Sequence, residues 1–365
     1  MVVDRELVGR ARKTVLCAGE IAVLLVSIEP SLAGAQPVRT VHLRGRMRRV
    51  AAMVWFSLAM AVASARPLHA AEAPRQVAII VGEGYQWEEV YGAFKEFVAA
   101  GVRVDLFSRD GGRPQPQKSS LLTPSENFMG SDSTNRVTIG VGRLLSKSKL
   151  LRRVTDATLF QMGFGIGRRI DPRRKDNTLA VQLEDRLQHT RPLAELDVDH
   201  YRSGGIYLPG GNGTYHHWVI GHGTPKARLD PALERVLRDA AKKQIVLGAV
   251  CHASGLLALV VDPNEPERPS MVHGRFAIGL PDPVERFINL LGLIDREWKM
   301  KTLLPIALLR SGGAKISSLR VGYAILNPRW VVRTSHRIYT GVGPKAAGPV
   351  AKRMNLGRPP PWRSR

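Results

Sequence analysis

Residues 244–259, Gln244-Ile-Val-Leu-Gly-Ala-Val-Cys251-His252-Ala-Ser-Gly-Leu-Leu-Ala-Leu259, predict a buried strand, a sharp turn and an apolar helix. The run 245–250 is short and continuously apolar, as in a strand covered on both faces. Small residues follow Cys251 and His252, so the chain can bend tightly and present the cysteine at the turn. The N-terminus of the following helix should favour the thiolate of Cys251. The pattern alone leaves two interpretations open, a reactive nucleophile and a buried structural cysteine.

The composition indicates a globular chain with an uneven charge. The 365 residues are 44% hydrophobic, which provides for a substantial core, and the formal net charge is +23. Between residues 136 and 175, eleven Lys and Arg residues face only Asp156 and Asp171. A net positive charge of this size is typical of proteins that bind nucleic acid or an anionic membrane. No nucleic-acid motif is visible, so we interpret the segment as a solvated basic loop and expect no specific nucleic-acid partner.

The N-terminal part of the chain resembles an export signal. Residues 44–49 are rich in arginine, residues 50–65 are uncharged and mostly apolar, and Ala63-Ser-Ala65 offers a cleavage site. We therefore predict a signal peptide at 47–73, with 1–46 as a mis-assigned extension and Met47 as the true start. The apolar run is short for a spanning helix, so we expect no stable membrane span after cleavage. The expected location is periplasmic or secreted, with a cytoplasmic location as the alternative, and cleavage would remove Cys17 and leave Cys251 as the sole thiol.

The folded region starts near residue 75 with an alternation of strands and helices. Strands are predicted at 76–81, 102–108 and 205–209, and helices at 87–100 and 230–243, the second capped by Asp230. Such strand–helix–strand units predict a parallel sheet, in which ligands bind beyond the carboxyl ends of the strands. A hairpin at 330–333 and 337–340, a helix at 344–354 and a disordered tail at 357–365 complete the chain.

The segment from about 112 to 190 is the least regular part. Its glycines, Gly163-Phe-Gly-Ile-Gly167, match no phosphate-binding fingerprint. We interpret the segment as a basic insertion that forms a cap or flap over the sheet, with its role left open.

Four motifs, in order, resemble the ThiJ/PfpI superfamily with its class I glutamine amidotransferase-like fold. They are VAIIVGEGYQWEEVYGAF, DHYRSGGIYLPGGNGT, AVCHASGLLAL and RIYTGVGPKAAGPVAKRM. The resemblance covers about residues 75–356 without the insertion, and is nearest to the glyoxalase III and heat-inducible chaperone branch. It implies a three-layer αβα sandwich around a flavodoxin-like, mostly parallel sheet with a cysteine at the nucleophile elbow.

The resemblance also implies roles for individual residues. Cys251 would be the nucleophile and His252 its partner, while Glu89 would hydrogen-bond the sulfur. The acid of a Cys-His-acid arrangement would lie in the segment LPDPVE, with Glu285 preferred and Asp282 as the alternative. The backbone N–H groups of Gly211 and His252 would form the oxyanion hole. The runners-up for the first acid are Glu83 and Glu88.

Each acid also has a plain structural interpretation. Glu89 fits an ordinary first-turn helix acid, and Glu285 fits a surface helix residue. His216, His217 and His222 follow the glycine loop, but no zinc spacing accompanies them, so no metal and no cofactor is expected. Two positions depart from the family: Ala253 replaces a glycine, and Asn212 stands where histidine is common.

The expected activity is a cysteine-dependent enzyme, most similar to glutathione-independent glyoxalase III, which converts methylglyoxal to lactate. A cysteine amidase or peptidase and a non-enzymatic stress protein, either a holdase chaperone or a redox sensor, remain as alternatives. The expected partner is a small aldehyde or amide substrate, and the resemblance also implies a homodimer.

Overall fold

The computed structural model of the chain describes residues 75–122, 124–129, 136–161, 178–221, 227–290 and 304–355. The predicted extension at 1–46, the signal peptide at 47–73 and the tail at 357–365 lie outside the described residues, as do the glycines of 163–167 and His222. No helix of the described residues combines the length and the apolar character needed to cross a membrane.

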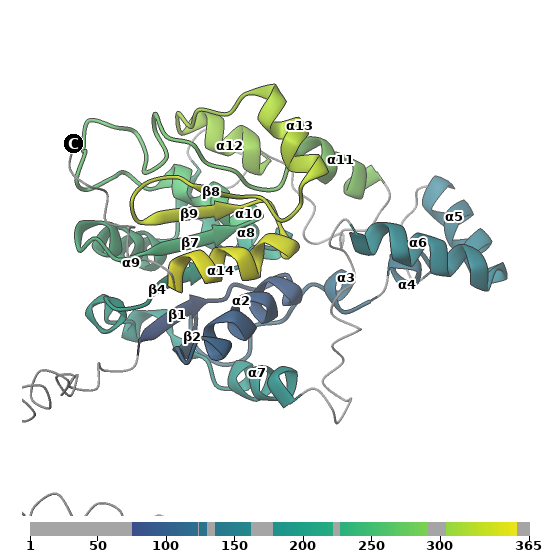
Figure 1. Cartoon of the computed structure of the whole chain (residues 1–365), viewed down its shortest axis with the longest axis horizontal. Helices are drawn as coiled ribbons and strands as arrows, with labels where there is room; N and C mark the ends of the chain where they lie inside the picture. The colour runs from purple at the N-terminus through teal and green to yellow at the C-terminus, as the bar shows by residue number, and fades with distance from the viewer. Residues whose placement is uncertain are drawn as a thin grey trace, which may run out of the picture. The chain divides into compact units, whose positions relative to one another are not determined.

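A seven-stranded sheet forms the centre of the folded region (Figure 1). Its strand order is β3-β2-β1-β4-β7-β9-β8, and all neighbouring strands are parallel except the last pair. The strands are β1 (Gln76–Ile80), β2 (Arg103–Ser108), β3 (Arg191–Pro192), β4 (Gly205–Leu208), β7 (Leu247–Val250), β8 (Val331–Arg333) and β9 (Ile338–Gly341). The order β2-β1-β4-β7-β9 is that of a flavodoxin-like sheet, which confirms the predicted fold class.

Alternate residues of the central strands face two separate cores. Val77 and Ile79 of β1 pack into one core, and Ala78 and Ile80 into the other, all four fully buried. This burial on both faces explains why β1 is a continuous apolar run rather than an alternating one. The sheet is therefore the middle layer of a three-layer sandwich.

Helices from distant parts of the sequence cover the two faces. The core that contains Val77 is closed by α2 (Trp87–Ala99), α7 (Thr178–Gln188) and α14 (Ala347–Asn355). The core that contains Ala78 is closed by α8 (Asn212–Trp218), α9 (Pro231–Lys242), α10 (His252–Leu256), α12 (Pro305–Ser311) and α13 (Ser318–Leu326). Asp230 caps α9 as predicted, because its carboxylate accepts hydrogen bonds from Ala232 N at 2.9 Å and Leu233 N at 3.4 Å.

The basic insertion contains helices that the sequence patterns did not predict. They are α3 (Lys118–Leu121), α4 (Pro124–Met129), α5 (Arg136–Lys147) and α6 (Lys149–Gln161), followed by α7. Of these, α7 belongs to the helical layer, where Leu183 and Leu187 are buried and Trp87 Nε1 donates to Glu184 Oε1 at 2.5 Å. At least this last part of the insertion is thus structural. The cap or flap role of the remainder stays a prediction.

Several predicted boundaries shift by a few residues. The strand expected at 245–250 begins at Leu247, and the helix expected at 344–354 begins as a 3-10 turn at Pro344–Ala346 before α14. The predicted hairpin is present as β8 and β9. The helix after the elbow is shorter than predicted: α10 ends at Leu256, and a 3-10 turn, Leu257–Leu259, follows.

Candidate active site

Cys251 sits at a strained turn between β7 and α10. Its backbone has φ 56° and ψ −126°, and Gln244 is the only other described non-glycine residue with a positive φ. A left-handed conformation costs free energy for a residue with a side chain, so a fold retains it where the surroundings hold it. Here the Cys251 N–H donates to Gly341 O at 3.0 Å, and Ser254 Oγ donates to Ala249 O at 3.1 Å. The geometry is that of a nucleophile elbow.

The loop after β4 passes directly against this elbow. A Cβ atom added to Gly210 would lie 2.7 Å from Cys251 Cβ and 2.9 Å from Glu89 Oε2. Gly211 adopts φ 121°, and a Cβ there would lie 2.5 Å from Gly84 O. Gly210 therefore lets the backbone approach the cysteine, and Gly211 lets it approach the loop between β1 and α2, more closely than a residue with a side chain would allow.

Glu89 lies on the same side of the elbow, in the first turn of α2. It is fully buried, and its Oε2 accepts a hydrogen bond from Gly210 N at 2.5 Å. Burial raises the pKa of Glu89 from its usual 4.5 to about 7, against opposing hydrogen bonds from Gly210 and the Cys251 side chain and the nearby His252. A carboxyl group with this pKa exchanges its proton readily at neutral pH.

The two alternatives to Glu89 have other partners. Glu83 Oε2 accepts from Gln115 N at 2.8 Å, and Glu88 Oε2 accepts from Gln86 Nε2 at 2.8 Å. Of the three acids, Glu89 is the one beside Cys251: Cys251 Cβ and Glu89 Oε2 both lie within 3 Å of the position of a Cβ atom added to Gly210, and the charge of Glu89 raises the pKa of the Cys251 thiol.

His252 links the thiol to a second buried acid. Cys251 Sγ and His252 Nδ1 lie 3.3 Å apart, and His252 Nε2 lies 3.2 Å from Glu285 Oε2. The second pair is at ion-pair distance but is not aligned as a hydrogen bond. His252 is 1% exposed and Glu285 is fully buried, so solvent does not screen this contact. Sulfur, imidazole and carboxylate therefore form a Cys-His-Glu row.

Asp282, the alternative to Glu285, serves a different purpose. Both residues belong to α11 (Asp282–Leu290), but Asp282 Oδ1 accepts from Ile306 N at 3.0 Å, at the start of α12. The structure thus places Glu285 beside His252 and uses Asp282 to hold α12. The plain interpretation of Glu285 as a surface residue is wrong.

Two polar residues that the sequence did not single out for the site complete it. Asn212 Nδ2 donates to Glu285 Oε1 at 2.6 Å. Asn212 and Gln117 are joined reciprocally: Asn212 N donates to Gln117 Oε1 at 3.0 Å, and Gln117 Nε2 donates to Asn212 Oδ1 at 3.2 Å. All three residues are buried. Asn212 was noted as a departure from the family, whereas nothing in the sequence pointed to Gln117, which lies in the insertion.

The expected thiolate is not the resting form of Cys251. Burial, followed by the charges of Glu89 and Glu285, raises the pKa of the Cys251 thiol well above its usual range. The hydrogen bond from the His252 backbone N–H acts in the predicted direction but is outweighed. A five-residue helix offers only a small dipole against two buried carboxyl groups. The thiol therefore needs a base, and His252 Nδ1 is within reach.

The expected oxyanion hole remains a prediction. The N–H group of Gly210 is directed to Glu89, while Gly211 and His252 stand at the starts of α8 and α10. N–H groups at a helix start have no acceptor within the helix. The backbone of these two residues would supply donors to a developing oxyanion, the His252 N–H from a position in which it already hydrogen-bonds the Cys251 sulfur.

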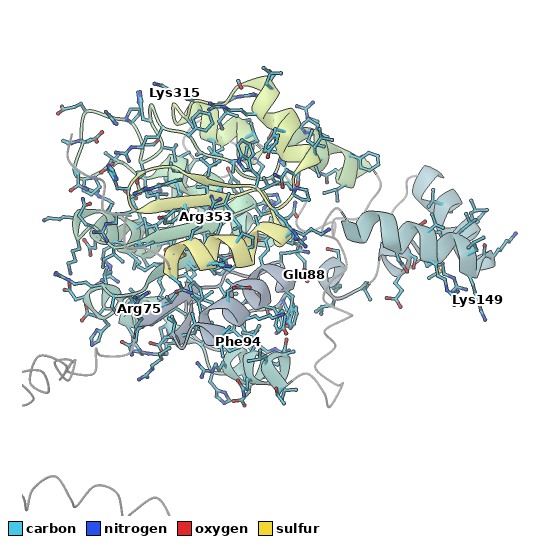
Figure 2. The ribbon with its side chains drawn as sticks, in the orientation of Figure 1. Arg75, Glu88, Phe94, Lys149, Lys315 and Arg353 are labelled. Atoms are coloured by element: carbon cyan, nitrogen blue, oxygen red, sulfur yellow. The ribbon has the colours of Figure 1, made fainter. Side chains whose placement is uncertain are left out.

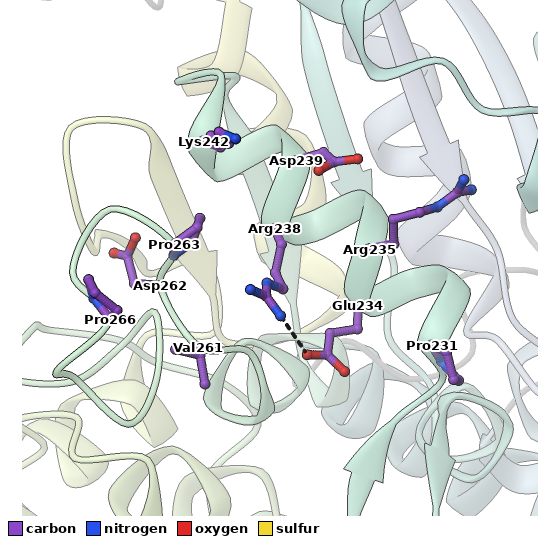
Figure 3. Close-up of a pocket in the computed structure, with 10 residues that line it drawn as sticks. All are labelled: Pro231, Glu234, Arg235, Arg238, Asp239, Lys242, Val261, Asp262, Pro263 and Pro266. Carbon is purple, nitrogen blue, oxygen red and sulfur yellow. Dashed lines mark ion pairs between the residues drawn. The ribbon is translucent and has the colours of Figure 1, made fainter.

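Two further features do not join this site. His216 and His217 lie in the last turn of α8, and burial lowers the pKa of His217, reinforced by the charge of Arg109. Among the described residues, no three His, Cys, Asp or Glu side chains are grouped as a metal site. Figure 3 shows a surface hollow between α9 and the loop that contains Val261 and Asp262, and its lining includes none of the residues around Cys251.

Comparison with known proteins supports the fold. The sequence matches no protein-family model and no curated protein at a significant level. The crystal structure of glyoxalase III from Candida albicans superposes with a TM-score of 0.51 at 17% identity, over 78% of this chain and 97% of that one. The Rapid Encystment Protein of 24 kDa from Francisella tularensis gives a TM-score of 0.48 at 16% identity, over 78% of this chain and 98% of that one. Drosophila melanogaster DJ-1beta gives a TM-score of 0.36 at 14% identity, over 78% of this chain and 92% of that one. The chain shares its α/β fold with this glyoxalase III structure, and this is the fold that the motifs resembling the ThiJ/PfpI superfamily imply.

Proposed function

We propose that the protein is a glutathione-independent glyoxalase III, which converts methylglyoxal to lactate through a covalent adduct of Cys251. The observation that carries the proposal is the row from Cys251 Sγ to His252 Nδ1 at 3.3 Å and from His252 Nε2 to Glu285 at 3.2 Å, with a second acid, Glu89, against the same sulfur. A nucleophile with an oriented base and a separate proton carrier is what this reaction requires.

The reaction begins with proton transfer from the thiol to His252. The sulfur then bonds to the aldehyde carbon of methylglyoxal. The aldehyde oxygen takes up a proton, which gives a hemithioacetal. Glu285 stabilises the imidazolium that forms, as the carboxylate does in other nucleophile–histidine–acid sites. The raised pKa of the thiol is overcome here because sulfur, base and acid are already in contact.

The second step moves a hydrogen between the two carbonyl carbons. Glu89 as carboxylate removes the hydrogen on the sulfur-bearing carbon, the electrons form an enediol, and a proton returns to the neighbouring carbon. The first carbon is thereby oxidised to a thioester while its neighbour is reduced to an alcohol, so no external oxidant is needed. Water then cleaves the carbon–sulfur bond, which releases lactate and restores the thiol. The pKa of Glu89, about 7, suits a group that both takes and returns a proton.

The buried position of the thiol argues against a peptidase and against a redox sensor. Cys251 is 5% exposed and both acids are fully buried, so a polypeptide backbone has poor access, whereas a three-carbon aldehyde is small. A redox sensor needs an accessible cysteine of low pKa, and the pKa of Cys251 is raised. A small-amide hydrolase uses the same row of residues and is the strongest competitor.

The test is lactate formation from methylglyoxal without glutathione by the full chain, its Cys251→Ser variant and its Cys17→Ser variant. The wild type and the Cys17 variant should form lactate at equal rates, while Cys251→Ser should fall to the background rate. The same three proteins are assayed for ammonia release from small amides. Equal lactate formation by all three proteins would overturn the proposal, and Cys251-dependent ammonia release without lactate would identify an amidase.

A further inference from the structure

Among the described residues, one part of the insertion carries a group of exposed apolar side chains. Eight of the sixteen large apolar side chains that are exposed among the described residues lie between Leu121 and Val154. Five of them are on α5 and α6: Ile139, Leu144, Leu150, Leu151 and Val154, of which Leu150 is 71% exposed. A solvent-exposed surface that binds no partner rarely carries so many aliphatic side chains together. We call the exposed side of these two helices the α5–α6 surface.

The charge exposed on the α5–α6 surface is entirely positive among its described side chains. Arg143, Lys147, Lys149 and Arg153 are exposed between the aliphatic groups, and Figure 2 shows Lys149 extending outward from its helix. The one acid between residues 136 and 161, Asp156, is engaged internally, because its two oxygens accept from Ser125 N at 2.8 Å and from Ser125 Oγ at 3.0 Å.

The exposed aliphatic side chains and the cations of the α5–α6 surface together favour one class of binding partner. A second copy of the chain would bring cations against cations, so charge complementarity argues against self-association through this surface. Nucleic acid would pair with the cations but would leave the leucines without a partner, and the exposed side chains described on α5 and α6 include no aromatic ring for base stacking. An anionic lipid bilayer satisfies both, because phosphate headgroups pair with Lys and Arg while aliphatic side chains enter the acyl boundary.

We propose that the α5–α6 surface binds anionic membranes peripherally. In this arrangement α5 and α6 lie in the headgroup plane, with Leu150 and Val154 inserted and Lys149 and Arg153 paired to lipid phosphates. The interaction is independent of the chemistry at Cys251, and it gives the basic insertion a role at a lipid surface.

The test is co-sedimentation of the full chain with vesicles of equimolar phosphatidylglycerol and phosphatidylcholine, against vesicles of pure phosphatidylcholine. The double variant Lys149→Glu with Arg153→Glu reverses the charge, and Leu150→Ser with Val154→Ser removes the apolar contact. Since the whole chain carries +23, a matched charge reversal on α9, Arg235→Glu with Lys242→Glu, controls for general attraction. Both of these α9 side chains are exposed and line the hollow in Figure 3.

The wild type should bind the anionic vesicles and not the neutral ones. The charge variant on α6 should lose at least roughly 30-fold in partition coefficient, and the serine variant about tenfold or more, while the α9 control changes little. Equal losses in the α9 control and the α6 charge variant, or no loss in the serine variant, would overturn the proposal. Tighter binding to a DNA duplex than to the vesicles at the same ionic strength would also overturn it, in favour of a nucleic-acid surface. Unchanged far-ultraviolet circular dichroism and unfolding midpoints show that each variant is folded.

Discussion

Replacing Glu89 by glutamine should stabilise the protein at pH 8 while greatly lowering its activity. The Glu89 carboxyl is fully buried, and its pKa rises from the usual 4.5 to about 7 chiefly because burial penalises the charge. The folded state therefore holds this proton more tightly than the unfolded chain does. The contribution of the protonated Glu89 to the free energy of unfolding is fully present below about pH 4.5. It is lost as the pH rises toward 7, because ionisation then favours the unfolded chain.

The magnitude follows from the two pKa values. The difference between 4.5 and about 7 corresponds to about 3 kcal/mol at ~1.4 kcal/mol per pH unit. Glutamine cannot ionise, and its carbonyl can still accept the hydrogen bond that Gly210 N donates to the carboxylate. We expect the Glu89→Gln variant to match the wild type near pH 4.5 and to exceed it by up to about 3 kcal/mol at pH 8. Methylglyoxal turnover should fall about 100-fold or more, because the proton carrier is lost.

Urea-induced unfolding of both proteins at several pH values between 4.5 and 8 measures the difference. Glu267→Gln, at an exposed carboxyl on a loop, is the matched control and should follow the wild type at every pH. Parallel curves for the wild type and Glu89→Gln, or a variant less stable at pH 8, would refute the reasoning about burial. A variant that gains stability and keeps full activity would refute the role in proton transfer.

Three further substitutions test other parts of the site. Asn212→Ala removes the amide donor that lies 2.6 Å from Glu285, which should cost about 2 kcal/mol in transition-state stabilisation. We expect kcat to fall more than KM changes, and an unchanged kcat would contradict a positioning role for Asn212. Gly210→Ala places a methyl group 2.7 Å from Cys251 Cβ, which should destabilise the fold by roughly 1–3 kcal/mol and remove activity. A fully active and equally stable variant would show that the loop does not pack against Cys251 as described. Asp230→Ala removes the cap of α9 and should lower stability by about 1 kcal/mol, with activity per folded molecule unchanged; a selective loss of turnover would contradict a purely structural role.

Features that depend on neighbouring residues in the sequence could be predicted. The apolar run of β1, the cap at Asp230 and the β8–β9 hairpin follow from local patterns, and the structure has all three. Glu89 and Glu285 could be named through the resemblance, since each stands in a recognisable motif. Their proximity to Cys251 and His252 is a property of the folded chain, which brings the ends of β7, α2 and α11 together.

Features that depend on burial or on distant residues could not be predicted. The pKa of Cys251 was expected to fall because of the helix after it, but the loss of water on burial, followed by the charges of two buried carboxyl groups, raises it instead. Gln117 reaches Asn212 across 95 positions, and no local pattern encodes that contact. The helices of the insertion were missed because their apolar residues are interspersed with cations and two of them, α5 and α6, expose much of their aliphatic surface.

The covalent intermediate at Cys251 tests the central claim most directly. The full chain is mixed with methylglyoxal without glutathione, quenched with acid within one turnover, digested and analysed by mass spectrometry. The account predicts a thioester on the peptide that contains Cys251, heavier by one methylglyoxal, which forms and decays at rates consistent with lactate production. Lactate formed with no adduct at Cys251, or an adduct that persists while lactate accumulates, would contradict the claim that this thiol carries the reaction.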